Sequence, residues 1–218
     1  MSGGFLAPLF FFFLGGGEGG GPEPTTLPDV AWVNGSYALI LAADERGVVV
    51  GELRGTLSSL SWQLNDVGQA QLTVAPAAAD LVEFGNQLLV YLDNGLPTWA
   101  GVVDPPRSRR YGSVEVTAYS GERLLLHRLT GRNRVFTQAN AGAVVRQLLA
   151  EQAGPAVVEV GVVDIDGAFL TVAYHYEDLL PVLQDGLVGI ADFDVTGMVV
   201  AGRIRFRLNL YRRRGREL

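Results

Sequence analysis

The stretch LSSLSWQLNDVGQAQLTV, residues 57–74, decides the class of fold. In its first half Leu60, Trp62 and Leu64 alternate with serine and glutamine, so that one side of the segment is apolar. An apolar face that repeats every second residue predicts a half-buried β-strand over the first eight residues. The composition of Asn65–Gly68 predicts a turn, and the residues after it alternate again. The stretch therefore predicts two short strands joined by a turn.

The same signals continue on both sides of this stretch. Short runs of β-branched and aliphatic residues are separated by turn-rich segments, including the Asn-Gly pair at 94–95, which is the strongest short hairpin signal. We expect further strands at 37–42, 48–54, 86–93, 97–103 and 113–119. Many short strands with close turn signals predict a small antiparallel β-barrel or β-sandwich over residues 36–119.

Residues 120–218 have a different pattern, which predicts a small α+β lobe. A helix is expected over 140–153, with Asn140 as its N-cap and Gly154-Pro155 at its end. We also expect a short helix or turn at 121–129, a second helix at 178–190, and a closing strand pair at 193–200 and 203–211. The predicted fold class is therefore mainly β with a two-helix α+β lobe.

The N-terminal segment, residues 1–35, combines an apolar arm with a flexible linker. FLAPLFFFFL at 5–14 is too short to span a membrane as a helix, which needs about 20 residues, and no basic residue precedes Arg46. A Gly- and Pro-rich tract follows it at 15–24. Burial in the protein's own core and burial in a partner are equally compatible with this arm. Its predicted partner-binding residues are Phe5, Leu6, Leu9, Phe10, Phe11, Phe12, Phe13 and Leu14.

Composition excludes several classes of function. Only 18% of the 218 residues are charged, compared with roughly 25% in an average soluble domain, which suggests that other chains cover part of the surface. The net charge of −6 argues against a nucleic-acid binder. The absence of cysteine excludes disulfides and thiolate metal sites. The two histidines, His127 and His175, leave little for a zinc or acid–base centre.

No catalytic or metal-binding motif is complete. Ser120 does not lie in a G-x-S-x-G elbow. Asp164 and Asp166 resemble the start of a calcium loop, but position 173, where that loop needs a glutamate, is alanine, so a β-turn is the better interpretation. We predict no catalytic residue, no metal ligand and no cofactor, and expect that the protein is not an enzyme.

Arginines gather near the C-terminus. Arg203, Arg205 and Arg207 alternate on one face of a predicted strand. They are either solvated or form a basic interface that meets an acidic chain, lines a nucleic-acid channel or serves self-association. The complete predicted interface is Arg203, Arg205, Arg207, Arg212, Arg213 and Arg214.

The order of the segments resembles a known family. A tryptophan strand (LSSLSWQLND) is followed by VGQAQLTV, LVEFGNQLLVYLD, PTWAGVVDPP, VEVTAYSGERLLLHRL and YEDLLPVLQDGLVGIADFDV. This order, over about residues 55–211, resembles that of phage tail hub proteins, the tail-associated and baseplate-hub family.

The resemblance implies a non-enzymatic structural protein of the virion, at the tip of the phage tail. It implies a homo-oligomer, a trimer that adapts the six-fold tail tube to a three-fold tip, and no active site. Its implied partners are the tail tube or distal tail protein, the tape-measure protein and other tail-tip proteins, with nucleic acid only if DNA passes a central channel and no membrane span. Such hubs usually continue into a second related half, whereas this sequence ends at Leu218, as a minimal hub, a split gene or a partial chain would.

Two other functions stay open. A carbohydrate- or cell-surface-binding β module of a virion would stack sugars on exposed Trp32, Trp99 or Tyr111. A hydrolase would use acidic residues, but Asp192 and Asp194 lie on an alternating strand where we expect both to be solvated. The hydrolase candidates are Asp164, Asp166, Asp192 and Asp194.

Overall fold

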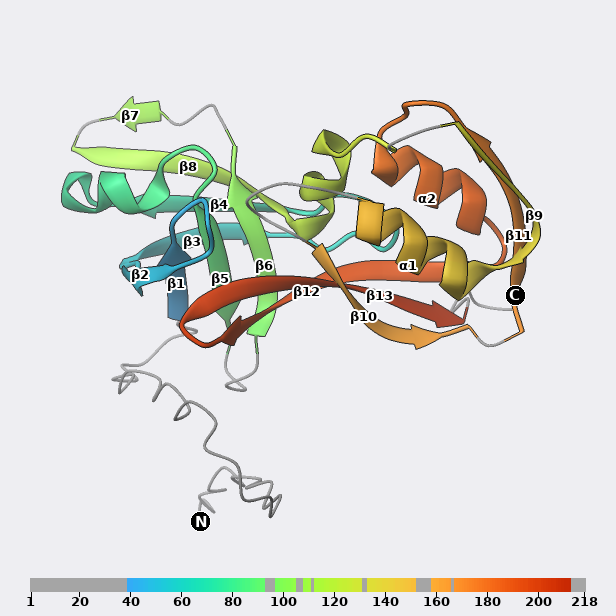
Figure 1. The fold of residues 1–218 in the computed structure, drawn as a ribbon. Coiled ribbons are helices and arrows are strands. Elements are labelled where there is room, and N and C mark those ends of the chain that lie inside the picture. The colour runs from blue at the N-terminus through green and yellow to red at the C-terminus, as the bar shows by residue number, and fades with distance from the viewer. Residues whose placement is uncertain are drawn as a thin grey trace, which may run out of the picture.

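The protein is described by a computed structural model, in which two lobes lie side by side (Figure 1). The structure describes residues 39–92, 97–104, 108–110, 112–130, 133–151, 158–165 and 167–212. Strands dominate both lobes, and the two α-helices belong to the C-terminal lobe. The predicted class, mainly β with a two-helix α+β lobe, is confirmed.

The first lobe is an antiparallel sheet in the order β2-β1-β5-β6-β8-β4-β3, with β7 paired to β8. Within the described residues its two end strands, β2 and β3, do not pair with each other, so the sheet is sandwich-like and the barrel alternative is wrong. The strands are β1 (Leu39–Ala43), β2 (Val49–Glu52), β3 (Gly55–Leu60), β4 (Gln69–Val74), β5 (Gln87–Tyr91), β6 (Pro97–Val103), β7 (Ser108–Arg110) and β8 (Ser113–Ser120).

Side chains on one face of this sheet form a mainly aliphatic core. On β4 and β8 every second residue is buried, and Leu72 pairs directly with Val116 in the ladder. The 3-10 helix η1 (Pro76–Val82) adds Ala79 and Val82 to the same cluster. Full burial of a valine or leucine side chain stabilises a fold by about 1.5–3 kcal/mol. The alternation of apolar and polar residues in the sequence therefore reflects strands that are buried on one face.

The second lobe carries two helices over small sheets. A mixed sheet has the order β10-β13-β12, with β10 parallel to β13, and β9 pairs with β11 in a separate ribbon. The predicted cap of the first helix is confirmed, because Asn140 Oδ1 accepts a 3.0 Å hydrogen bond from the Ala143 amide. The elements are η2 (Gly121–His127), β9 (Arg134–Asn140), α1 (Ala141–Glu151), β10 (Val158–Asp164), β11 (Phe169–Tyr174), α2 (Leu179–Leu187), β12 (Ala191–Val200) and β13 (Arg203–Arg212).

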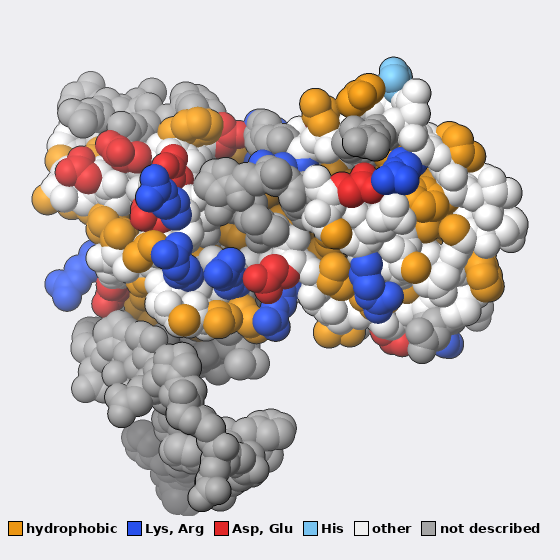
Figure 2. Space-filling view, viewed as in Figure 1, with side chains coloured by type: hydrophobic (Ala, Val, Ile, Leu, Met, Phe, Trp, Pro, Cys, Tyr) orange, Lys and Arg blue, Asp and Glu red, His pale blue; other side chains and the backbone are white. Residues whose placement is uncertain are grey.

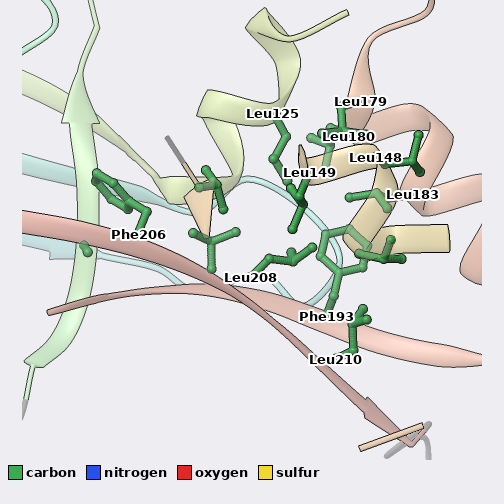
Figure 3. Packing of buried hydrophobic residues seen from close by; sticks show 14 of the residues in the cluster. Leu125, Leu148, Leu149, Leu179, Leu180, Leu183, Phe193, Phe206, Leu208 and Leu210 are labelled. Atoms are coloured by element: carbon green, nitrogen blue, oxygen red, sulfur yellow. The ribbon is translucent and has the colours of Figure 1, made fainter. Parts of the chain in front are cut away.

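A single apolar cluster joins the lobes. Figure 3 shows leucines of α1 and α2, among them Leu149 and Leu183, pointing toward Phe193 and Leu208 of the β12–β13 hairpin. Leu89 of the first sheet belongs to the same cluster. The long hairpin thus continues from beneath the helices onto the first sheet, and the two lobes share a core.

The tip of the β12–β13 hairpin is fixed to the first lobe by backbone hydrogen bonds. Gly202 has a positive φ of 72° in the tip, and its carbonyl accepts from the Val49 amide at 2.9 Å. The Ile204 amide donates to the Gly47 carbonyl at 2.7 Å. The turn at Ala201-Gly202, between the two strands expected at 193–200 and 203–211, therefore also docks the hairpin against the turn between β1 and β2.

The strand expected over 57–64 is wrong in its second half. β3 ends at Leu60, and its ladder with β4 shifts register between Leu57 and Ser59. This irregularity interrupts the alternation, so Trp62 and Leu64 are 57% and 51% exposed rather than on a buried face. Residues 61–67 form a loop, called here the Trp62 loop.

Candidate interaction site at the junction of the two lobes

The apolar arm falls outside the described residues. Its predicted partner-binding residues, from Phe5 to Leu14, therefore stay a prediction, as do Arg213 and Arg214 at the other end of the chain. Neither α-helix in the described ranges has the length and apolar character needed to cross a bilayer.

The arginines of β13 lie on its solvent-facing side. Arg203 and Arg205 are exposed, while the intervening Ile204 and Phe206 are buried. On the neighbouring β10, Glu159 Oε1 lies 3.7 Å from Arg205 Nη1, and Glu159 Oε2 lies 3.8 Å from Arg207 Nε. Figure 2 shows arginine side chains, with an acidic group beside them, over this part of the molecule. The face is therefore mixed in charge, and its role as a basic interface stays a prediction.

The two aspartates on β12 are not the solvated residues that the sequence led us to expect. Asp192 is buried and accepts a 2.9 Å hydrogen bond from Asn65 Nδ2. Asp194 is half-buried and accepts a 2.9 Å hydrogen bond from Asn209 Nδ2. The expectation failed because Asp192 has a partner on the distant Trp62 loop, and Asp194 is bonded to Asn209, its cross-strand neighbour on β13. Both aspartates therefore make hydrogen bonds between elements of the fold.

The sugar-stacking alternative loses one of its three aromatic residues. Trp99 is only 3% exposed and belongs to the core of the first sheet, so its predicted exposure is wrong. Trp32 and Tyr111 fall outside the described residues. Of the two tryptophans that the structure describes, the exposed one is Trp62, which was expected on a buried strand face.

Trp62 lies at a pocket of about 450 Å³ between the lobes. Four elements surround it: the Trp62 loop, β6, the Ser120–Glu122 corner and β12. The residues that line this junction pocket are Trp62, Gln63, Leu64, Trp99, Ala100, Ser120, Glu122, Asp194, Val195, Thr196 and Gly197.

Glu122 is the buried acid of the junction pocket. It is 4% exposed, and its Oε1 accepts a 2.7 Å hydrogen bond from the Val195 amide. Its other oxygen, Oε2, is also buried and makes no hydrogen bond of ordinary geometry to a described residue. Burial raises the pKa of Glu122 to about 7, and Asp194 adds to this rise, whereas the Ser120 hydroxyl and nearby amides oppose it. Glu122 is not part of any motif in the sequence.

Asn65 fixes the Trp62 loop to the second lobe. Its backbone is left-handed, with φ of 65°. The Phe193 amide donates to Asn65 Oδ1 at 2.6 Å, and Gln184 Nε2 donates to the Asn65 carbonyl at 2.8 Å. Asn65 Nδ2 donates to Asp192, as described above, and the Asn65 amide donates to the Phe193 carbonyl at 3.0 Å. The wall that carries Trp62 is therefore held in place by several hydrogen bonds.

The remaining candidates for chemistry are dispersed. Among the described residues no cluster of three or more His, Asp or Glu side chains could hold a metal ion. His175 is exposed, and its ring meets the edge of Tyr176 at 4.8 Å between centroids. Asp164 is exposed at the end of β10, and Asp166 falls outside the described residues.

No protein-family model and no curated protein matches this sequence. Two solved structures similar to the chain are tail proteins or related to them. The E. coli c3393 protein, described as a type VI secretion system component with structural similarity to T4 bacteriophage tail proteins gp27 and gp5, aligns at 16% identity and a TM-score of 0.47. The alignment covers 82% of this chain and 46% of that protein.

The second is the prophage tail protein gp18 from Listeria monocytogenes EGD-e, at 13% identity and a TM-score of 0.48. This alignment covers 78% of the chain described here and 50% of gp18. The chain thus spans about half the length of each of these proteins.

Proposed function

We propose that this protein is a structural, non-enzymatic component of a phage tail, a hub at the distal tip. One observation carries the proposal: the segments whose order resembles tail hub proteins fold together as one body with a shared core. A protein that holds successive tail parts in register must keep its own lobes in a fixed relation. The apolar cluster, the docked hairpin tip and the Asn65 hydrogen bonds supply that fixed relation here.

The exposed surface supports assembly with neighbouring chains. The β9–β11 ribbon has two strands, so each strand has one edge without a ladder partner among the described strands. Val135 on β9 is 73% exposed and Phe169 on β11 is 56% exposed. Open strand edges with apolar side chains are the features that assembled proteins cover with other chains.

The finer proposal is a homotrimer that joins the tail tube to the tip, with Phe5–Leu14 docked in a hydrophobic groove of a neighbouring tail protein. Among the described residues, the first of which is Leu39, the two apolar clusters are large and well buried. Deleting residues 1–24 should therefore abolish incorporation into tails while the melting temperature stays within a few degrees of the full chain. Electron microscopy of tails from a complemented deletion phage measures incorporation.

A matched variant in which Phe10–Phe13 are replaced by serine tests the apolar character of the arm without changing chain length. We expect the same loss of incorporation because the serines remove the apolar surface that would be buried. Normal tails with either variant would contradict the docking role. Aspartate-to-asparagine changes at Asp164, Asp192 and Asp194 that abolish a function of tails containing the folded protein would contradict the non-enzymatic role.

A further inference from the structure

We propose that the junction pocket binds an arginine side chain presented by a partner protein. The proposal rests on the residues of the pocket alone and does not depend on the tail role. It names the chemistry of one contact: a guanidinium group that enters between the lobes and meets the carboxylate of Glu122.

The wall of the junction pocket contains a buried acceptor, the carboxyl group of Glu122. Glu122 Oε1 is occupied by the Val195 amide, whereas the buried Oε2 makes no hydrogen bond of ordinary geometry to a described residue. A buried carboxylate oxygen is strongly favoured to gain a donor, above all a charged one. Because Glu122 lines the junction pocket, this oxygen is the acceptor that a donor entering the pocket would meet.

Two carboxyl groups, Glu122 and Asp194, line the junction pocket, and none of its lining residues is basic. Asp194 accepts from Asn209 and Tyr211 through Oδ1, and its carboxyl group adds to the negative potential of the pocket. This pair of acids favours a cation, and the cation must come from outside the pocket.

The aromatic residues of the pocket favour arginine over lysine. Trp62 is exposed and Trp99 lines the same pocket. A planar guanidinium stacks on indole faces and offers five donors in a fork, whereas an ammonium group is a compact, strongly hydrated charge. The volume of about 450 Å³ is within the range of roughly 300–1,000 Å³ typical of sites for small organic groups.

The rim explains why the arginine should arrive on a protein. Leu64 belongs to the lining of the junction pocket and also to that of a neighbouring hollow that includes Val188. Leu64 is 51% exposed and Val188 is 74% exposed. Apolar residues beside a charged pocket suit a segment that buries its flanking side chains against them. The Asn65 hydrogen bonds hold this rim in place before binding.

The test uses the full chain and N-acetyl-arginine-methylamide as the probe. Its matched probe is the citrulline analogue, which keeps the shape and loses the charge. In ¹H–¹⁵N spectra the indole signals of Trp62 and Trp99 should shift on titration with the arginine probe, and at least ten-fold more weakly with the citrulline probe. Equal shifts with both probes, or none, would overturn the proposal.

Glu122→Gln should weaken binding of the arginine probe at least ten-fold, whereas Glu83→Gln, at an exposed acid outside the pocket lining, should leave it unchanged. Between pH 6 and pH 8 the full chain should bind roughly ten-fold more tightly as Glu122 ionises, since only the ionised fraction is competent. Asp194 is the other titratable group lining the pocket.

A separate change keeps the test decisive if Glu122→Gln does not fold. Trp62→Ala alters an exposed side chain, so the fold should remain, and binding followed by the Trp99 indole should weaken several-fold. Unchanged affinity in a folded Trp62→Ala variant, or equal affinity for a norleucine probe, would show an apolar pocket and overturn the assignment to arginine.

Discussion

Inside the first sheet, β4 and β8 bury alanine, valine and leucine side chains against one another, whereas the junction between the lobes also buries Glu122 and Asp192. The aliphatic core can be filled by many side chains of suitable volume. The junction polar groups need particular partners at particular positions, and leaving one unpaired is costly. The difference teaches that aliphatic burial supplies most of the stability, while the hydrogen bonds at the junction fix how the lobes meet.

The largest expected effect comes from removing an apolar residue that both lobes share. Phe193 is fully buried in the cluster that includes residues of both lobes. Phe193→Ala should lower the free energy of unfolding by about 3–5 kcal/mol, because it removes a large buried ring and leaves a cavity. Urea unfolding followed by circular dichroism measures the loss. Leu129→Ala, at an exposed leucine, is the control and should change stability by less than about 0.5 kcal/mol.

The same experiment tests the shared core. Far-UV circular dichroism of the strands and near-UV circular dichroism of the aromatic residues should show one transition at the same urea concentration, in the full chain and in Phe193→Ala. Two separated transitions would show that the lobes unfold independently, and the comparison between core and junction would then have to be made for each lobe alone.

Glu122 gives the next effect, and it depends on pH. Its pKa is about 7 in the folded protein, against the ordinary value of 4.5 for an unfolded chain. Between these values the folded state binds more protons than the unfolded state, so this group's stabilisation is complete below about pH 4.5 and is lost as the pH rises through about 7. The pKa difference corresponds to on the order of 3 kcal/mol.

Glu122→Gln isolates this contribution because glutamine has the same shape and does not titrate in this range. The free energy of unfolding of the variant minus that of the unmodified protein should be larger at pH 8 than at pH 5. Urea unfolding of both proteins at the two pH values measures this difference. A difference between the two proteins that does not change with pH would show that Glu122 is solvated, and the junction would then lack its buried acid.

Sequence pattern predicted the aliphatic part of the fold far better than the junction. The strands at β4 and β8 follow from alternation within a few residues, and α1 follows from its apolar spacing and the Asn140 cap. The β9–β11 ribbon was missed because its register shifts between Leu170 and Val172, and Gln138 has a positive φ, so neither strand alternates cleanly.

The junction residues could not be found from local pattern because their partners are remote in sequence. Glu122 accepts from Val195, which is 73 residues away, and Asn65 accepts from Phe193 at a separation of 128 residues. The only local signals were a lone glutamate before a leucine run and an asparagine in a turn. Both are also common at exposed positions, so they did not single out these two residues.

Asn65 provides a smaller effect that separates its conformation from its hydrogen bonds. Asn65→Ala removes the side-chain bonds to Asp192 and the Phe193 amide and places a less suitable residue at φ of 65°. We expect a loss of about 1–3 kcal/mol in the free energy of unfolding. Asn65→Gly relieves the backbone but still lacks the bonds, so it should recover only part of that loss. Full recovery with glycine, in urea unfolding, would mean that conformation alone matters at this position.

The smallest expected effect is at the arginines of β13, and it distinguishes folding from assembly. Arg205 and Glu159 are each about two-fifths exposed, and their closest nitrogen–oxygen distance is 3.7 Å. Exposed pairs of this kind contribute about 0–1 kcal/mol, so Arg205→Ala should leave the free energy of unfolding nearly unchanged. If this face meets an acidic neighbour, the same variant should reduce incorporation into tails at unchanged stability, and Arg205→Lys should restore part of it. A loss of stability as large as that of Asn65→Ala would instead show that the arginines of β13 stabilise the fold. The exposed face of β13 would then not differ from the interior in its contribution to stability.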